Sequence, residues 1–262
     1  MTDQTKIPER RAGKMGLRLP LDRGVLHTCS VNLLDVLVDG VTPLEGWHTF
    51  DARGTIPAHG WGMDYNDQLG CCGFAGCDHG NMAEANNAKL SGQLYTPPYG
   101  NLADAYWDYG IAEGESGPRP DQGVSNDVFV PWLVTKGFAK NTVEVPLQYL
   151  SWTASQSKGL LLGVSLDNDA ENDFEATPQI PWGSKSERPN PMEGHDIWFV
   201  QASPWVTNGK AVGEIVTWGW TQPIAYDFVE KNISDAHLIV FKNSAIIDQN
   251  KYAAAITALN SL

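Results

Sequence analysis

One cysteine-rich stretch constrains the fold of this chain more than any other. Residues 66–79 read NDQLGCCGFAGCDH, and a run of small residues continues from there to about residue 89. A polar turn followed by such a run predicts a loop and then a helix that begins at Cys72. Unpaired backbone N–H groups and the positive end of the helix dipole favour a thiolate at this position. Cys72 is therefore a candidate nucleophile.

The same stretch has a second interpretation as a tightly packed core helix, because cysteine is among the most buried residue types. A nucleophilic cysteine needs a histidine partner. His195 fits this role best, because it follows Gly194 directly before an apolar run and can face a cleft from the mouth of a strand. His79 lies two helical turns beyond Cys72, too far to act as its base. We therefore expect His79 to be a packing or helix-surface residue.

Composition and charge exclude several classes of function. The chain has 262 residues and a formal net charge of −13, which argues against a nucleic-acid surface. No apolar run approaches the roughly 20 residues that span a bilayer, and the first residues hold no apolar signal segment. Three of the four cysteines crowd into one helix start, unlike a disulfide framework. We expect synthesis in the cytoplasm, and neither a metal nor an organic cofactor.

The N-terminal segment differs in charge from the rest of the chain. Residues 1–24 carry six basic side chains against three acidic ones, whereas residues 25–262 are strongly acidic and are predicted to form a single domain. A basic arm on an acidic body suggests a protein partner. We expect the arm to dock on other protein subunits with Leu17, Leu19 and Leu21 buried at the interface. A solvated tail is the alternative.

Turn and cap signals divide the chain into helices followed by strands. Asn101 is a good N-cap for a helix, and Gly137 suits the C-terminal end of another. This order predicts an α+β fold with a helical lobe, a sheet lobe and a site in the cleft between them. The predicted helices cover residues 72–89, 102–109, 126–135, 221–229 and 249–259; the predicted strands cover residues 159–166, 197–201, 213–218 and 237–241; a long loop is predicted over residues 167–191.

Five short motifs in order resemble the papain-like cysteine peptidases, specifically their divergent bacterial and phage branch. They span roughly residues 43–243: N-D-x-L-G-x-C at 66–72, D-x-G at 121–123, G-V-x-L at 163–166, G-H at 194–195 and T-W-G at 217–219. The resemblance implies a papain-like two-lobed α+β fold. Its helical lobe would hold a central cysteine helix, and its second lobe would be an antiparallel sheet.

The resemblance also implies the roles of the site residues. Cys72 would be the nucleophile and His195 the general acid and base of a cysteine hydrolase, a peptidase or an amidase that cleaves a protein or peptide substrate through a thioester. Papain-like enzymes carry an oxyanion-binding Gln six residues before the cysteine. Here that position is Asn66, whose side-chain amide is also a donor.

One position departs from the family pattern. The residue that orients the histidine is normally an Asn two residues before a tryptophan that shields the site, and this chain has Val216 there, before Trp218. Thr217 is the nearest polar substitute, and loss of the orienting residue slows such enzymes strongly. Together with the basic arm, this departure supports an alternative: a catalytically impaired structural component of a phage virion, either a head decoration or a tail protein.

Overall fold

The computed structural model describes residues 10–15, 17, 46–88, 99–185, 188–204, 211–242 and 244. The expectations for Leu19, Leu21 and the helix over 249–259 lie outside these residues. Within them, no helix is long and apolar enough to cross a membrane.

Three of the predicted helices form close to their expected bounds. The cysteine helix begins at Cys72, as predicted. Asn101 caps the next helix, because its side-chain oxygen accepts from the backbone N–H groups of Ala103 at 3.1 Å and Asp104 at 3.3 Å. Gly137 follows the third helix with a φ of 73°, the left-handed conformation that often ends a helix. The helices are α2 (Cys72–Asn87), α3 (Leu102–Ala112), α4 (Asn126–Thr135), α5 (Leu150–Ser157), α6 (Ala170–Glu175) and α7 (Tyr226–Lys231).

The strands form one antiparallel sheet in the order β2-β7-β3-β4-β5-β6, and the short β1 pairs with β4. All four predicted strands are present, and all lie in this sheet. The bounds are β1 (Phe50–Asp51), β2 (Ala139–Glu144), β3 (Leu160–Ser165), β4 (Gly194–Ala202), β5 (Ala211–Thr217), β6 (Trp220–Ala225) and β7 (Ile233–Phe241).

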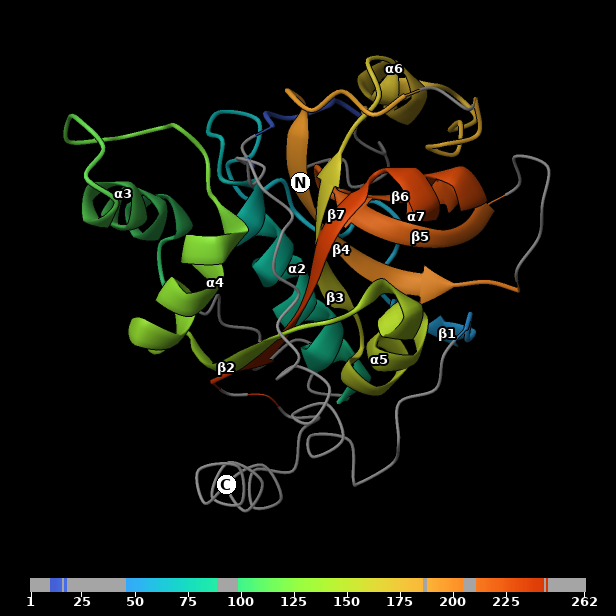
Figure 1. Ribbon diagram of the computed structural model, residues 1–262, viewed down its shortest axis with the longest axis horizontal. Coiled ribbons are helices and arrows are strands. Elements are labelled where there is room, and N and C mark those ends of the chain that lie inside the picture. The colour runs from blue at the N-terminus through green and yellow to red at the C-terminus, as the bar shows by residue number, and fades with distance from the viewer. Residues whose placement is uncertain are drawn as a thin grey trace, which may run out of the picture.

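Helix α2 lies between the other helices of the first half and the sheet (Figure 1). On one side of the sheet, Trp198 of β4 and Val216 of β5 belong to the same core cluster as Cys72. On the other side, Ile197 and Phe199 of β4 belong to a second cluster. Strand β4 therefore alternates between two buried faces, and α2 covers one of them.

Two local expectations are wrong. The loop predicted over residues 167–191 contains helix α6, whose first turn holds Glu171 and Asp173, side chains that the helix dipole favours there. The helix predicted over 221–229 is strand β6 followed by α7. Residues 220–225 pair with β5 along their whole length, and this pairing overrides the local helical pattern.

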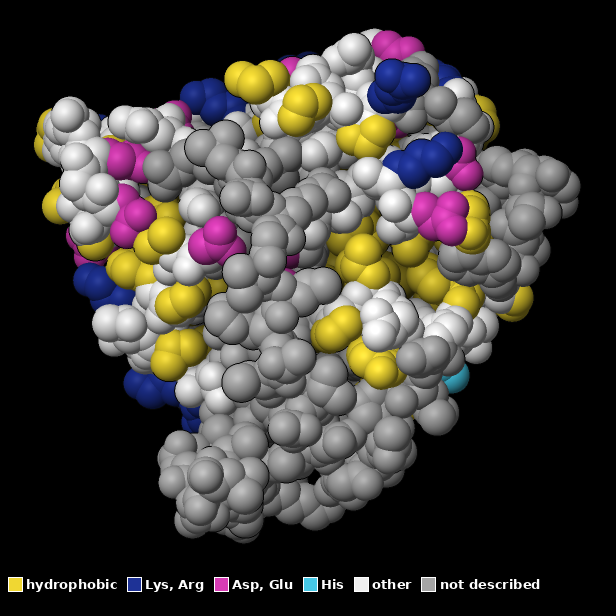
Figure 2. Space-filling view, in the orientation of Figure 1, with side chains coloured by type: hydrophobic (Ala, Val, Ile, Leu, Met, Phe, Trp, Pro, Cys, Tyr) yellow, Lys and Arg dark blue, Asp and Glu magenta, His cyan; other side chains and the backbone are white. Residues whose placement is uncertain are grey.

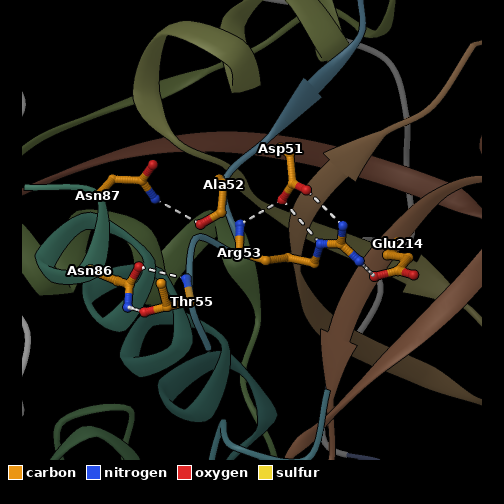
Figure 3. A network of polar contacts seen from close by, with 7 residues as sticks. All are labelled: Asp51, Ala52, Arg53, Thr55, Asn86, Asn87 and Glu214. Atoms are coloured by element: carbon orange, nitrogen blue, oxygen red, sulfur yellow. Dashed lines mark hydrogen bonds and ion pairs between the residues drawn. The ribbon is translucent and has the colours of Figure 1, made fainter. Parts of the chain in front are cut away.

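A polar network ties the segment after β1 to both α2 and β5 (Figure 3). The Arg53 guanidinium donates to Asp51 at 2.6 Å and to Glu214 of β5 at 2.7 Å. The Asn86 side chain, near the end of α2, accepts from the Thr55 backbone at 3.1 Å and donates to its hydroxyl at 3.0 Å. These contacts hold the C-terminal end of α2 against the sheet, while its N-terminal end carries the candidate nucleophile.

Candidate active site

Cys72 opens helix α2 and is fully buried. Its Sγ lies 4.0 Å from Oδ2 of Asp196, the third residue of β4. The adjacent Cys71 points elsewhere, with its Sγ 3.4 Å from the backbone oxygen of Asp64. The two neighbouring thiols thus face different surroundings, as the helical geometry predicts.

The two other described cysteines are poor nucleophiles. Burial raises the pKa of the Cys71 thiol to about 12. Burial also raises the pKa of the Cys77 thiol, more than a hydrogen bond with Tyr99 lowers it. Both thiols are therefore protonated at neutral pH, and a protonated thiol is a weak nucleophile.

His195 and Trp218 are neighbours, as predicted from the two motifs. Their ring centroids are 4.9 Å apart, and both residues are buried. His195 is the second residue of β4, and Trp218 directly follows β5, the adjacent strand. The indole therefore covers the imidazole from the neighbouring strand.

Thr217 holds the imidazole. Its Oγ1 lies 2.7 Å from Nε2 of His195, and both groups are buried. Val216, at the position where an orienting Asn was expected, is part of the core cluster on the α2 side. The polar substitute is thus one residue further along β5, where strand alternation directs the side chain to the side of His195.

A tight turn places the indole over the imidazole. Trp218 and Gly219 have φ angles of 46° and 78°, and Thr217 pairs with Trp220 across the two-residue turn. Positive φ at both central residues is typical of a type I′ hairpin. A bulky residue in this conformation is strained, and such strain concentrates at functional sites. Gly219 is also required because Gly62 pairs with it at close range.

The imidazole of His195 is neutral over most of the pH range. Complete burial, and secondarily the charge of His79, lowers its pKa from 6.5 to about 3. Among the residues that the structure describes, Nδ1 of His195 has no hydrogen-bond partner. No hydrogen bond therefore joins this nitrogen to Cys72.

His79 is held away from this pair, as expected for a residue two turns along α2. Its Nε2 lies 3.0 Å from the backbone oxygen of Gly62 and 3.3 Å from Oδ2 of Asp64. Burial alone lowers the pKa of His79, but its hydrogen bond and ion pair with Asp64 outweigh that effect, and the pKa is raised.

Consecutive residues of β4 explain how Cys72 and His195 are arranged. Asp196 faces α2 and contacts Cys72, whereas His195 faces the second core cluster, to which Trp218 belongs. Asp196 is not among the predicted site residues, although a carboxylate inside an otherwise apolar strand is a visible signal of a buried polar site. Within the described ranges, no group of three His, Cys, Asp or Glu side chains is arranged to hold a metal ion.

The candidate oxyanion donor, Asn66, is occupied by the N-terminal arm. Its Nδ2 donates to the backbone oxygen of Lys14 at 2.9 Å and to that of Leu69 at 3.2 Å. The Lys14 N–H donates to the Asn66 backbone oxygen at 2.5 Å, and the Leu17 N–H donates to that of Gly194 at 3.1 Å. A main-chain segment thus lies across the site in the way that a peptide would.

The described part of the arm contacts its own chain. Arg10 donates to the Ala176 backbone oxygen, and a Cβ at Gly13 would overlap the Asn66 carbonyl and the Trp218 ring. Leu17, which we expected at an interface with another subunit, is buried in its own chain. Main-chain hydrogen bonds and the close packing of Gly13 hold this part of the arm in addition to its polar side-chain contacts.

Comparison with known proteins identifies the fold. No protein-family model matches the sequence, and no curated protein matches it. Among solved structures, the chain is similar to xylellain, a cysteine protease from Xylella fastidiosa, with a TM-score of 0.52 and 11% identity over 90% of this chain and 99% of that one. The fold is therefore the papain-like α+β fold, with a central cysteine helix packed against an antiparallel sheet, as the sequence predicted.

Proposed function

We propose that this protein is a papain-like cysteine hydrolase, a peptidase or amidase, with Cys72 as nucleophile and His195 as general acid and base. The observation that carries the proposal is the arrangement of His195. Its imidazole is held by the Thr217 hydroxyl and covered by Trp218, one residue before the carboxylate that contacts Cys72. An imidazole held in one orientation, on the strand whose next residue contacts a cysteine at a helix start, supports a role in acyl transfer.

The reaction would proceed through a thioester. The Cys72 thiolate attacks a substrate carbonyl, and the oxygen that gains negative charge accepts a hydrogen bond from Nδ2 of Asn66. That nitrogen already donates to a peptide carbonyl, the backbone oxygen of Lys14. The proton lost by the Cys72 thiol passes through His195 to the leaving amine, and the neutral imidazole then activates the water that hydrolyses the thioester. Trp218 shields the imidazole from bulk water.

The test is covalent labelling together with turnover. Full-length protein, a variant lacking residues 1–17 and the same deletion with Cys72→Ala are incubated with an epoxide probe for cysteine peptidases and with a fluorogenic peptide library. We expect labelling at Cys72 and cleavage by the truncated protein, and neither by the Cys72→Ala form. A folded truncated protein that neither labels nor cleaves would contradict the proposal.

A second candidate is a papain-like structural component of a phage virion. One observation favours it: the site is closed by the arm, and Nδ1 of His195 lacks a hydrogen-bond partner among the described residues. In this proposal, residues 1–24 would dock on other subunits. Deleting them should then prevent incorporation into the particle while Cys72→Ala leaves incorporation unchanged, and the reverse result would favour the hydrolase.

A further inference from the structure

A buried carboxyl group lies directly against the candidate nucleophile. Asp196 is 2% exposed, and its Oδ2 is 4.0 Å from Sγ of Cys72. The same oxygen is so close to the first turn of α2 that a Cβ at Gly73 would lie 2.9 Å from it. Among the described residues no basic side chain contacts Asp196, and a buried carboxyl group without such a partner is costly, so its place beside a reactive thiol calls for a functional explanation.

Asn126 connects Asp196 to a second carboxylate. The Nδ2 of Asn126, the first residue of α4, donates to Oδ1 of Asp196 and to Oδ1 of Asp235, each at 2.8 Å. Asp235 is further held by the Ser234 hydroxyl at 2.8 Å and by Nε2 of His237 at 3.0 Å. The two carboxyl groups thus have unequal support, because Asp235 contacts an amide, a hydroxyl and an imidazole, whereas Asp196 contacts the Asn126 amide and the weaker thiol donor of Cys72.

This inequality decides which carboxyl group is the stronger base. Burial alone raises the pKa of Asp235, but hydrogen bonds from His237, Asn126 and Ser234 outweigh it, and the pKa is lowered. Burial and the nearby charge of Asp235 raise the pKa of Asp196 well above its ordinary value, despite the bond from Asn126. Asp235 is thus the ionised member, and Asp196 is the one able to take a proton.

We propose that Asp196 is the proton acceptor for Cys72 in the resting protein. The S–H bond of Cys72 breaks, its electron pair stays on Sγ, and an O–H bond forms on Oδ2 of Asp196. The negative charge moves from the carboxylate to the sulfur, so the buried site keeps the same total charge. The neutral carboxylic acid then donates a hydrogen bond to the thiolate, which stabilises it.

The other titratable groups near the pair are less suited to this role. From α2, Cys77 is affected by the charge of Asp196, and His79 affects His195 through its charge. From β7, Asp235 and His237 lie beyond Asn126. His195 faces the other side of β4. Asp196 is the carboxyl group that the structure places in contact with Cys72 Sγ.

The inference rests on the proposed function in one respect, that Cys72 is the nucleophile. Its test needs no substrate. The thiolate of Cys72 is measured by ultraviolet absorbance as a function of pH in the full-length protein, by subtracting the titration of the Cys72→Ser variant. The same titration is recorded for Asp196→Asn, for His195→Gln and for Asp235→Asn, which removes the charge that raises the pKa of Asp196 without touching Cys72.

We expect a thiolate signal at neutral pH in the wild-type protein, a weaker one in Asp235→Asn, and a loss of about tenfold or more in Asp196→Asn. Loss of the signal in His195→Gln with retention in Asp196→Asn would overturn the proposal, as would the absence of a neutral-pH thiolate in the wild type. If Asp196→Asn does not fold, carbon NMR of the Asp196 carboxyl group replaces it. Identical titrations in wild type and Cys72→Ser would then overturn the proposal.

A protein that forms the thiolate through Asp196 but cleaves no peptide would refute the hydrolase proposal alone. Conversely, a protein that cleaves peptides with an unchanged thiolate titration in Asp196→Asn would refute this inference alone.

Discussion

Two consecutive residues of β4 are fully buried in opposite chemical surroundings. The imidazole of His195 is hydrogen-bonded to Thr217 and sits under an indole ring. Asp196 accepts from Asn126 and contacts a thiol. Burial disfavours the charged form of both groups, so the imidazole stays neutral and the carboxylate binds a proton more readily than usual. The chemistry of the site follows from these two side chains and their few partners.

Thr217 should matter for both stability and turnover. In Thr217→Val, a methyl group replaces the hydroxyl beside Nε2 of His195, so this buried nitrogen loses its bond at a cost of about 1–3 kcal/mol. We expect the free energy of unfolding to fall by that amount. Peptide cleavage should fall roughly 10- to 100-fold, because the imidazole is no longer held. Thr217→Ser is the matched control, and equal losses in both variants would show that the hydroxyl is not what matters.

The buried imidazole predicts a loss of stability in acid. The pKa of His195 is about 3 when folded and 6.5 in its ordinary state, so the unfolded chain takes up the proton first as pH falls. The contribution is present above pH 6.5 and is lost toward pH 3, by up to about 1.4 kcal/mol per pH unit. Asp196 has the opposite effect on stability. Because its pKa is raised in the folded protein, its protonation in acid favours the folded state.

This prediction is tested by comparing how the free energy of unfolding changes with pH in wild type and in two histidine variants. The free energy of unfolding is followed by urea titration from neutral to acid pH for wild type and His195→Gln, with His59→Gln as a control at an exposed site. We expect the His195→Gln curve to lack the acid slope and the His59→Gln curve to keep it. Parallel curves for wild type and His195→Gln would contradict the buried, neutral imidazole.

At the scale of elements, the arm and α2 share one site. A side chain at Gly13 would overlap the Asn66 carbonyl and the Trp218 ring, so Gly13→Val should displace the arm. Overpacking costs about 1–3 kcal/mol, which corresponds to roughly 5- to 150-fold in the undocked population. We expect alkylation of Cys72 by iodoacetamide to accelerate within that range.

The control for this prediction is deletion of residues 1–17, which should give the fastest alkylation because no arm remains to dock. Reaction at Cys72 is followed by mass spectrometry of the modified peptide. An unchanged rate in both variants would show that the arm does not limit access to the thiol.

Elements with strong local signals could be predicted from the sequence, and elements defined by pairing could not. Helix α3 has its Asn101 cap, and the start of α2 follows from the turn before Cys72. Strand β6 forms because it pairs with β5. Its own residues do not alternate regularly between polar and apolar, so the sequence alone does not indicate a strand there. The Asp196–Asn126 contact joins residues 70 positions apart, so local patterns do not indicate it.

On the scale of the whole molecule, the acidic body and the basic arm suggest attraction by charge. Figure 2 shows Asp and Glu side chains interspersed with Lys and Arg over the described part of one face, so the negative charge there is not concentrated in one patch. The described arm contacts include one ion pair, between Lys14 and Asp121 at 3.1 Å, with side chains 51% and 29% exposed. The arm is held chiefly by main-chain hydrogen bonds to Asn66 and Gly194.

This difference predicts how salt affects the arm. A surface ion pair contributes about 0–1 kcal/mol and is screened at an ionic strength of about 1 M. Main-chain hydrogen bonds and the fit of Gly13 against Trp218 are far less sensitive to salt. Alkylation of Cys72 should therefore change by less than about twofold between low salt and about 1 M salt. The variant that lacks residues 1–17 is the control: any change of its alkylation rate with salt is an effect on the reagent itself, because it has no arm. An acceleration of roughly tenfold in the full-length protein alone would mean that long-range charge attraction, and not the main-chain contacts, keeps the arm over the site.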